Sequence, residues 1–410
     1  MPYLTRATGP ARASLAVCAP LMFGDADSSG YMRMFLESVC RYSSVNVDVV
    51  VDGDLMGLEA PDSRLNFIST RQFRWLMSHG NYDEVVYAMG NGPEYSYVYE
   101  LLKEGRGILW LQEVRLTDFY RAYYSHAGRD LTQLPPELAP WARRYPEHET
   151  NLLERDVLTQ HDQSIYLTGE VVSYARKVIV GSCFARELVE VDSAGSVPVV
   201  TLPAAAPGIG EVPADPWSSI AAGRDLSESD SLVLIEGEVK PQRSPEIIVD
   251  AFANVALTNG GLLLSFVGSC HPEYQRQLES RAATLGIENR VVFVSTASDS
   301  EAAGWAAAAT VCVQLQYPSD GESPWRSAGA LAAGIPTIVT EHGPLLELPD
   351  DAVMKLPVPV TSHNLAQAIN SLLNDEDRAA GLRREARAYA GTVTLELVTS
   401  KFVTEVLGGA

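Results

Sequence analysis

Two loops of this 410-residue chain place charged side chains beside an expected helix start, an arrangement that can bind a phosphate group. In the first loop, residues 236–247 (EGEVKPQRSPEI), Lys240 and Arg243 precede a helix predicted to begin with Ser244 as its cap and Pro245 at its first position. The N–H groups that open a helix have no partner within it, so they attract anions, and two cations beside them would neutralise a diphosphate. The alternative is two solvated loop cations.

The second loop lies in residues 319–340 (SDGESPWRSAGALAAGIPTIVT) and follows a predicted buried strand. Ser323 is the expected helix cap, Pro324 the first helical residue and Gly334 the residue that ends the helix. Glu322 cannot bind an anion, but it can accept hydrogen bonds from hydroxyl groups. We therefore predict that a sugar lies against Glu322, with its phosphate at the helix N-terminus.

Short β-branched runs alternate with helical patterns along nearly the whole chain, which is typical of parallel sheets covered by helices. A stretch rich in Pro, Gly, Ala and acidic residues, 204–230, separates two halves and marks a linker. The sequence therefore predicts two open α/β domains, each with a ligand crevice at the carboxyl ends of its strands. The strand-like runs are 14–19, 46–52, 84–90, 107–112, 177–182 and 197–203 in the first half, and 231–237, 262–268, 290–295, 310–316 and 336–340 in the second.

The net charge of −21, from 52 acidic and 31 basic residues, argues against nucleic acid and anionic membranes as partners. No apolar run approaches the length of about 20 residues that spans a bilayer, and the N-terminal residues lack the apolar segment of a secretory signal, so we expect a cytoplasmic protein. The five cysteines are scattered without a CxxC pair, which favours buried reduced thiols over a metal site or disulfides.

Several segments, taken together and in order, resemble the family 4 retaining glycosyltransferases of the GT-B fold, over essentially the full chain. The strongest match is GESPWRSAGALAAGIPTIVT followed by ELPDD. The other matching segments are the Ser-Gly loop at 29–30, YAMGNGPEY at 87–95, GEVKPQRSPEIIVDAF at 237–252, the segment 266–294 and AAAATVCVQL at 306–315. The resemblance is closest to bacterial relatives used in natural-product and polysaccharide assembly.

The resemblance implies two Rossmann-like doubly wound parallel-sheet domains facing each other across a cleft. Residues 1–207 would bind the acceptor and carry a helical insertion at about 118–165. Residues 208–392 would bind the donor, and the last helix, within 393–410, would cross back onto the first domain. An apolar stripe of Leu395, Val398, Phe402 and Val406 suits that crossing.

The implied activity is hexosyl transfer from a UDP- or GDP-sugar, with retention at the anomeric carbon and without a metal ion or other cofactor. The linkage to the acceptor stays open between oxygen, sulfur and nitrogen. We expect a small soluble acceptor because no basic amphipathic membrane-docking helix is evident. Tyrosine-rich stretches at 94–100 and 118–126 have two interpretations. One is core packing. The other is an aromatic pocket, which in acidic surroundings would suit a cationic acceptor such as an aminocyclitol or a betaine thiol.

Carried over position by position, Arg243 matches the family's diphosphate-binding lysine, Glu322 approximates the glutamate that contacts donor-sugar hydroxyls, and Ser323 matches its phosphate-facing turn. Lys240 and Arg243 would stabilise the leaving diphosphate, Glu322 and Gln112 would orient the sugar, and Glu113 would lie near the acceptor. The candidate donor-binding residues are Ser29, Gly30, Gly237, Gly268, Gly321, Ser323, Pro324 and Trp325. The candidate acceptor-binding residues are Tyr95, Tyr97, Arg115 and Tyr120.

Three motifs of the family pattern are changed in this sequence. In the Glu–x7–Glu motif the first glutamate falls on Gly321, so Glu322 is shifted by one residue. The second glutamate of its Glu–x7–Glu motif falls on Gly329, its His-Asp pair is Gln112-Glu113, and the arginine before its diphosphate lysine is Glu238. Two alternatives to a transferase therefore stay open. One is another GT-B chemistry, such as a sugar-nucleotide epimerase or a phosphorylase, and the other is a non-catalytic protein that binds a sugar nucleotide.

Overall fold

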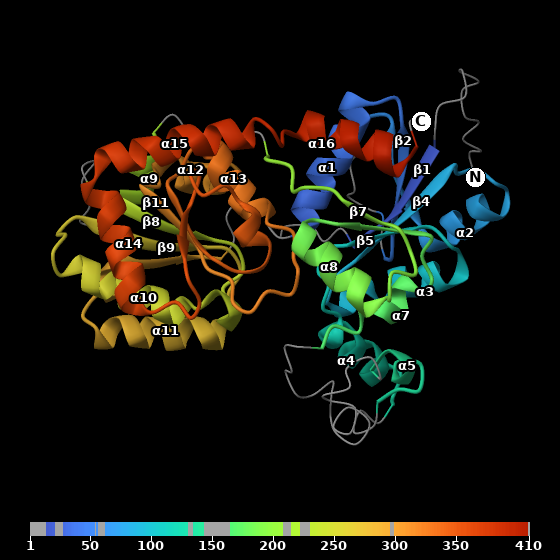
Figure 1. Ribbon diagram of the computed structural model, residues 1–410, viewed down its shortest axis with the longest axis horizontal. Coiled ribbons are helices and arrows are strands. Elements are labelled where there is room, and N and C mark those ends of the chain that lie inside the picture. Colours follow the sequence, from blue (N-terminus) through green and yellow to red (C-terminus); the bar gives the residue numbers. More distant parts are fainter. Residues whose placement is uncertain are drawn as a thin grey trace.

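The structure is a computed structural model that describes residues 14–20, 28–53, 55, 62–129, 134–142, 165–207, 215–221, 230–295 and 299–408. It has two α/β lobes that lie side by side (Figure 1), each built on one parallel sheet. The first sheet has seven strands in the order β3-β2-β1-β4-β5-β6-β7, and the second has six in the order β10-β9-β8-β11-β12-β13. Two doubly wound lobes of this kind confirm the predicted fold class.

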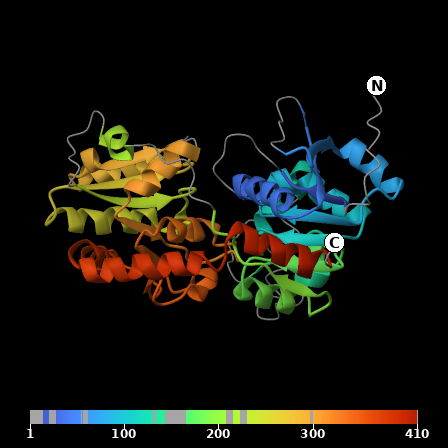
Figure 2. The same ribbon diagram turned by 90° about the horizontal axis from the view of Figure 1, so that it is seen from above.

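The strands are short, and those in the middle of each sheet are buried, because helices cover both sheet faces (Figure 2). The first sheet contains β1 Ser14–Cys18, β2 Asn46–Val51, β3 Leu65–Ser69, β4 Glu84–Met89, β5 Ile108–Leu111, β6 Lys177–Val180 and β7 Val199–Thr201. The second contains β8 Ser231–Glu236, β9 Leu262–Val267, β10 Val291–Val294, β11 Val311–Gln314, β12 Thr337–Thr340 and β13 Met354–Leu356. All predicted strands are present, whereas β3 and β13 were not predicted.

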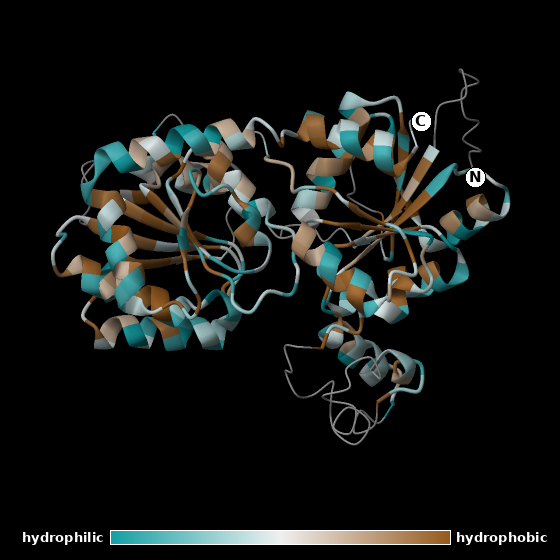
Figure 3. Ribbon diagram, in the orientation of Figure 1, coloured by the Kyte–Doolittle hydropathy of each residue, from teal (hydrophilic) through white to brown (hydrophobic). Residues whose placement is uncertain are grey.

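The helices present apolar faces to the sheets and polar faces outward (Figure 3). In the first lobe they are α1 Ser28–Tyr42, α2 Thr70–Ser78, α3 Ser96–Glu104, α4 Thr117–His126, α5 Ala139–Ala142, α7 Thr168–Val172 and α8 Cys183–Asp192. Later in the chain they are α9 Pro216–Ala221, α10 Pro245–Ala256, α11 Pro272–Thr284, α12 Asp299–Ala308, α13 Trp325–Ala333, α14 Ser362–Asn374, α15 Glu376–Ala390 and α16 Leu395–Lys401. Short helical turns are η1 Pro93–Tyr95, η2 Pro241–Arg243, η3 Glu288–Arg290, η4 Gly343–Glu347 and the π-turn η5 Phe402–Val406.

The predicted insertion at 118–165 is helical where it is described, in α4 and α5, and residues 130–133 and 143–164 lie outside the described part. Its tyrosines pack inward around a buried carboxylate. The hydroxyl groups of Tyr99 and Tyr120 donate to the two oxygens of Glu170 at 2.8 and 2.7 Å. Burial raises the pKa of Glu170, and these hydrogen bonds act against that rise. Core packing is therefore the correct interpretation for Tyr99 and Tyr120.

The end of the chain crosses back onto the first lobe, as the resemblance implied (Figure 1). The hydroxyl groups of Ser38 on α1 and Thr399 on α16 share a buried hydrogen bond of 2.7 Å. Phe402 is 1% exposed and packs edge-on against Phe35, with 5.4 Å between ring centroids. The crossing is therefore an apolar contact with a satisfied polar pair. Separately, no helix in the described residues is long and apolar enough to cross a membrane.

Candidate active site

A cavity of about 520 Å³ lies between the lobes, and both lobes line it. The first lobe contributes Pro20, Asn91, Gly92, Glu94, Tyr95, Gln112, Glu113 and Asp118. The second contributes Glu238, Lys240, Gln242, Arg243, Gln314, Leu315, Gln316, Asp320, Glu322, Ser323, Pro324, Trp325, Arg326, Ser327, Pro344 and Leu345. A concave interlobe site with a few convergent polar groups is typical of small-molecule binding.

Arg243 and Lys240 bring two of the cavity's cations from the loop after β8. The Arg243 Nη1 donates to the backbone oxygen of Glu236 at 3.0 Å, and its Nε is buried without a hydrogen-bond partner in the described part of the chain. Burial alone would lower the pKa of Lys240, but facing carboxylates, Glu113 first among them, outweigh burial and raise it. Lys240 therefore stays protonated, and Arg243 keeps an unused buried donor.

A third cation, Arg326, was not predicted from the sequence. It occupies the second position of α13, and its guanidinium lies over the ring of Trp325, with 4.2 Å between its Cζ and the ring centroid. Burial raises the pKa of Glu236, and the charges of Arg326 and Arg243 act to lower it. An arginine at the start of a helix of otherwise small residues was the signal that could have marked it.

Gly237 is the residue that lets Arg243 and Arg326 come together. It has φ +108°, and a Cβ atom built there would lie 2.6 Å from Arg326 Nε and 2.7 Å from Arg243 Nη1. Only glycine combines this backbone conformation with that close approach. The glycine after β8 is therefore part of the cation site, although it does not line the cavity itself.

Replacing Gly237 with alanine should weaken UDP binding about tenfold, because it displaces both guanidinium groups, and should cost about 1–3 kcal/mol of stability from backbone strain. The control is Gly53→Ala, since Gly53 has φ +124° and open space around a built Cβ. Calorimetric titration with UDP and urea unfolding would separate the two effects. Equal UDP affinity in both variants would mean that Gly237 does not position the cations.

The loop from Ser319 to Trp325 differs in detail from its prediction. The α13 helix begins at Trp325, with Pro324 as its N-cap and no side-chain capping bond, so the predicted Ser323 cap was wrong. The Ser323 N–H instead donates to the backbone oxygen of Gln112 in the other lobe at 3.3 Å. Ser323 lines the cavity, but its N–H already donates a hydrogen bond within the protein and is not free for a phosphate.

Ser244 differs from its prediction only in the missing side-chain hydrogen bond. It precedes α10, and Pro245 is the first residue of that helix, as predicted. However, Ser244 has φ 52° and makes no side-chain capping bond. A residue in this left-handed conformation does not hold its side chain as an extended N-cap residue does. Ser244 is therefore the N-cap residue by position, as predicted, but its side chain does not cap the helix. Lys240 and Arg243 lie beside this helix start.

Glu322 lies where the sequence predicted it, on the cavity wall. Its Oε2 accepts hydrogen bonds from the hydroxyl of Ser319 at 2.9 Å and from the N–H of Asp320 at 2.8 Å. These bonds fix the carboxylate through one oxygen. Its other oxygen, Oε1, has no hydrogen-bond partner among the described residues, so a ligand hydroxyl can approach it from the cavity.

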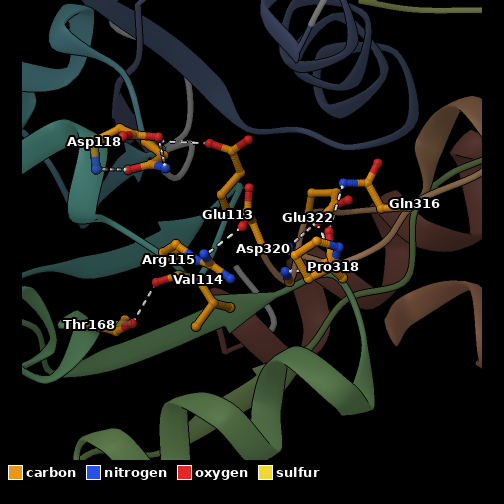
Figure 4. Close-up of polar contacts among 12 residues, drawn as sticks. Glu113, Val114, Arg115, Asp118, Thr168, Gln316, Pro318, Asp320 and Glu322 are labelled. Atoms are coloured by element: carbon orange, nitrogen blue, oxygen red, sulfur yellow. Dashed lines mark hydrogen bonds and ion pairs between the residues drawn. The ribbon is translucent and has the colours of Figure 1, made fainter. Parts of the chain in front are cut away.

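The same loop joins the lobes (Figure 4). The N–H groups of Val114 and Arg115 both donate to the backbone oxygen of Asp320, at 2.7 and 3.1 Å. The Arg115 Nε lies 3.0 Å from Asp320 Oδ1, and both side chains are almost fully buried. Gly321 has φ +73°, and a built Cβ would lie 2.7 Å from Val114 Cγ2. Arg115 and Gly321, predicted to bind ligands, therefore form the interlobe contact.

The remaining candidates divide between the cavity wall and its surroundings. The predicted residues on the wall are Tyr95, Gln112, Glu113, Lys240, Arg243, Glu322, Ser323, Pro324 and Trp325. Gly268 lies behind Gly237, close to its backbone oxygen, and the Tyr97 hydroxyl donates to the backbone oxygen of Val50 at 3.0 Å. Tyr120 is buried in the core of the first lobe, and Gly30 is exposed in the first turn of α1. The side chain of Ser29 lies outside the part of the chain that the structure describes.

Glu113 faces Lys240 across the cavity. Its Oε2 accepts a hydrogen bond of 2.8 Å from the N–H of Asn91. The side-chain oxygen of Asn91 in turn accepts hydrogen bonds from the N–H groups of Asp118 and Phe119 in the first turn of α4. Burial raises the pKa of Glu113, while the charge of Lys240 acts to lower it. In the described residues, no three His, Cys, Asp or Glu side chains gather as metal ligands would.

Comparison with known proteins bears on the second lobe and on the fold. Residues 220–389 match the family model described as "Glycosyl transferases group 1". No curated protein matches the sequence. Among solved structures, sucrose-phosphate synthase from Thermosynechococcus elongatus has a TM-score of 0.68 at 16% identity, with 97% of this chain and 100% of that chain covered.

Two further structures give the same result. HepE from Anabaena, solved with UDP and glucose, has a TM-score of 0.66 at 15% identity, with coverage of 97% of this chain and 100% of that one. WaaG, a glycosyltransferase involved in lipopolysaccharide biosynthesis, has a TM-score of 0.62 at 17% identity, with coverage of 96% and 100%. The fold is GT-B. At these identities the likeness concerns the fold, and the chemistry must be argued from the cavity.

Proposed function

We propose that the protein is a retaining glycosyltransferase that moves a sugar from a nucleoside diphosphate sugar to a small acceptor bound between the lobes. The observation that carries this proposal is the convergence of Lys240, Arg243 and Arg326 on one cavity wall. Arg243 there holds a buried Nε donor without a partner in the described residues, and a diphosphate oxygen would satisfy it.

The donor's diphosphate would lie against these three cations, and its sugar against Glu322. The group 1 match over the second lobe supports a donor site there, and the complex of HepE with UDP and glucose makes UDP-glucose the first donor to test. The three lining cations can balance the negative charge of a diphosphate, so we propose that no metal ion is needed.

In the proposed reaction, the bond between the anomeric carbon and the phosphate oxygen breaks while the acceptor oxygen bonds the same face of that carbon. The acceptor proton passes to the leaving phosphate oxygen, so no protein nucleophile is required. Lys240, Arg243 and Arg326 stabilise the negative charge that develops on the diphosphate. Glu322 and Gln112 orient the sugar, and closure of the lobes keeps water out.

The cavity volume of about 520 Å³ supports a small acceptor. We propose that this acceptor is of the kind modified in natural-product assembly and that the transfer takes place in the cytoplasm. The test of the function is release of UDP from UDP-glucose, measured without and with candidate acceptors, together with the anomeric configuration of the product by proton NMR. A retained configuration is expected. Binding of UDP-glucose without any turnover would instead indicate a non-catalytic protein.

Glu322→Ala should weaken UDP-glucose binding about tenfold while leaving UDP binding nearly unchanged, because the carboxylate would bond sugar hydroxyls rather than phosphate. Isothermal titration with both ligands measures the difference. Ser319→Ala is the control, since it removes a loop hydrogen bond to Glu322 but keeps the carboxylate. Equal losses for UDP and UDP-glucose would contradict the role of Glu322.

A further inference from the structure

The cavity wall formed by the first lobe is acidic. It carries Glu94, Glu113 and Asp118, and the described residues of that lobe which line the cavity include no lysine or arginine. Asp118 pairs with Arg121, whereas Glu94 and Glu113 make no ion pair within 4 Å among the described residues. Neither of these two carboxylates therefore has a cation within 4 Å among the described residues, although Lys240 faces Glu113 from the other lobe.

Glu94 and Glu113 lie at the same place on that wall. The Glu94 carboxylate lies against Gly92, so close that a Cβ atom built on Gly92 would clash with it. The Glu113 carboxylate accepts a hydrogen bond from the N–H of Asn91, the residue before Gly92. The two carboxylates thus flank the Asn91–Gly92 peptide at the end of β4.

The charge balance of the cavity favours a positive ligand on this side. Once Asp118 and Asp320 are set against their arginine partners, four lining carboxylates remain, those of Glu94, Glu113, Glu238 and Glu322. These four carboxylates outnumber the three cations that line the cavity. A bound nucleoside diphosphate would add negative charge and would pair with those cations. An acceptor with a positive charge would offset that excess.

Neighbouring groups add features that a hydroxylated ligand would use. Gln112 is 8% exposed, lines the cavity, and has a buried Nε2 without a hydrogen-bond partner in the described residues. This amide can donate to a hydroxyl oxygen. Tyr95 also lines the cavity, and an aromatic side chain attracts an ammonium group.

We infer that the acceptor of the proposed transferase is a hydroxylated amine, an amino sugar or aminocyclitol, whose ammonium group binds between Glu94 and Glu113 while Gln112 donates to one of its hydroxyls. This inference rests on the proposed function and names its acceptor class. Burial raises the pKa of Glu113, and the charges of Asp320 and Glu238 add to that rise. A bound cation relieves this repulsion between carboxylates.

The test compares amines with matched alcohols by isothermal titration, with and without saturating UDP. The pairs are 2-deoxystreptamine with myo-inositol and glucosamine with glucose. At least one amine is expected to bind tenfold or more tightly than its alcohol partner. If neither amine is preferred, the inference is overturned.

Variants locate the preference. The double substitution Glu94→Gln/Glu113→Gln should abolish the preference for the amine, while Glu190→Gln, at an exposed carboxylate on α8, should keep it. A retained preference in the double variant would also overturn the inference. The thermal shift with UDP checks that the double variant is folded, and Glu94→Gln alone replaces it if it is not.

The thermal shift that UDP produces also distinguishes a failure of this inference from a failure of the proposed function. If UDP does not stabilise the wild-type protein, the donor site fails, and amine binding without UDP still decides the inference. If UDP stabilises every variant but no amine is preferred, the donor site stands and the acceptor class is wrong.

Discussion

Arg243→Ala should lower kcat/KM for a nucleoside diphosphate sugar by about 10²–10³-fold, the usual cost of removing one charged contact to a developing anion. The guanidinium already donates to the Glu236 backbone oxygen through Nη1, so its position does not depend on the ligand. Its Nε is buried without a partner in the described residues. Removing a preorganised cation therefore removes stabilisation that water cannot replace.

The measurement is a UDP-release assay together with the thermal shift that UDP produces, which reports binding through mass action. Arg243→Lys keeps the charge but not the fork of donors, so we expect it to recover only part of the lost activity. Arg384→Ala, at an exposed position on α15, is the control and should keep the wild-type shift. An undiminished UDP shift in Arg243→Ala would place the diphosphate elsewhere.

Phe402→Ala should lower the free energy of unfolding by about 3–5 kcal/mol, as is typical of removing a buried phenylalanine. Phe402 is 1% exposed and contacts Phe35 and Trp110, with ring centroids 5.4 and 5.8 Å away. These rings join the end of the chain to the first lobe, so the cavity left by alanine would loosen that crossing as well as the core.

Leu397→Ala is the matched control, since Leu397 lies on α16 and is 51% exposed. It should change stability by no more than about 0.5 kcal/mol. Guanidinium unfolding followed by tryptophan fluorescence would measure the free energy of unfolding of both variants. Because the protein has two lobes, each unfolding transition should be fitted separately. Similar stabilities for the two variants would mean that the crossing contributes little to the first lobe.

The sequence predicted most of the fold because parallel strands buried on both faces are continuous apolar runs, which are easy to recognise. It missed β3, Leu65–Ser69, and β13, Met354–Leu356, which lie at the edges of their sheets. Edge strands are partly exposed and carry polar residues, such as Asn66 and Lys355 here. Their pattern is therefore weaker than that of a central strand.

The site was predictable where local chemistry marks it and not where the lobes meet. Lys240, Arg243 and Glu322 stand beside helix starts, and all line the cavity. Arg326 was missed because its role depends on Gly237 and Arg243, which are distant in sequence. Arg115 was assigned to an acceptor because its partner, Asp320, is brought to it only by the packing of two separate lobes.

The loop that carries Glu322 has a second task, because its backbone also holds the lobes together at Val114 and Arg115. Any hinge motion that parts the lobes must break the Arg115–Asp320 pair and release the residues on either side of Glu322. A ligand that binds only the joined arrangement would therefore favour lobe closure by as much as closure favours its binding. Substrate binding and formation of the cavity wall that carries Glu322 are then thermodynamically coupled.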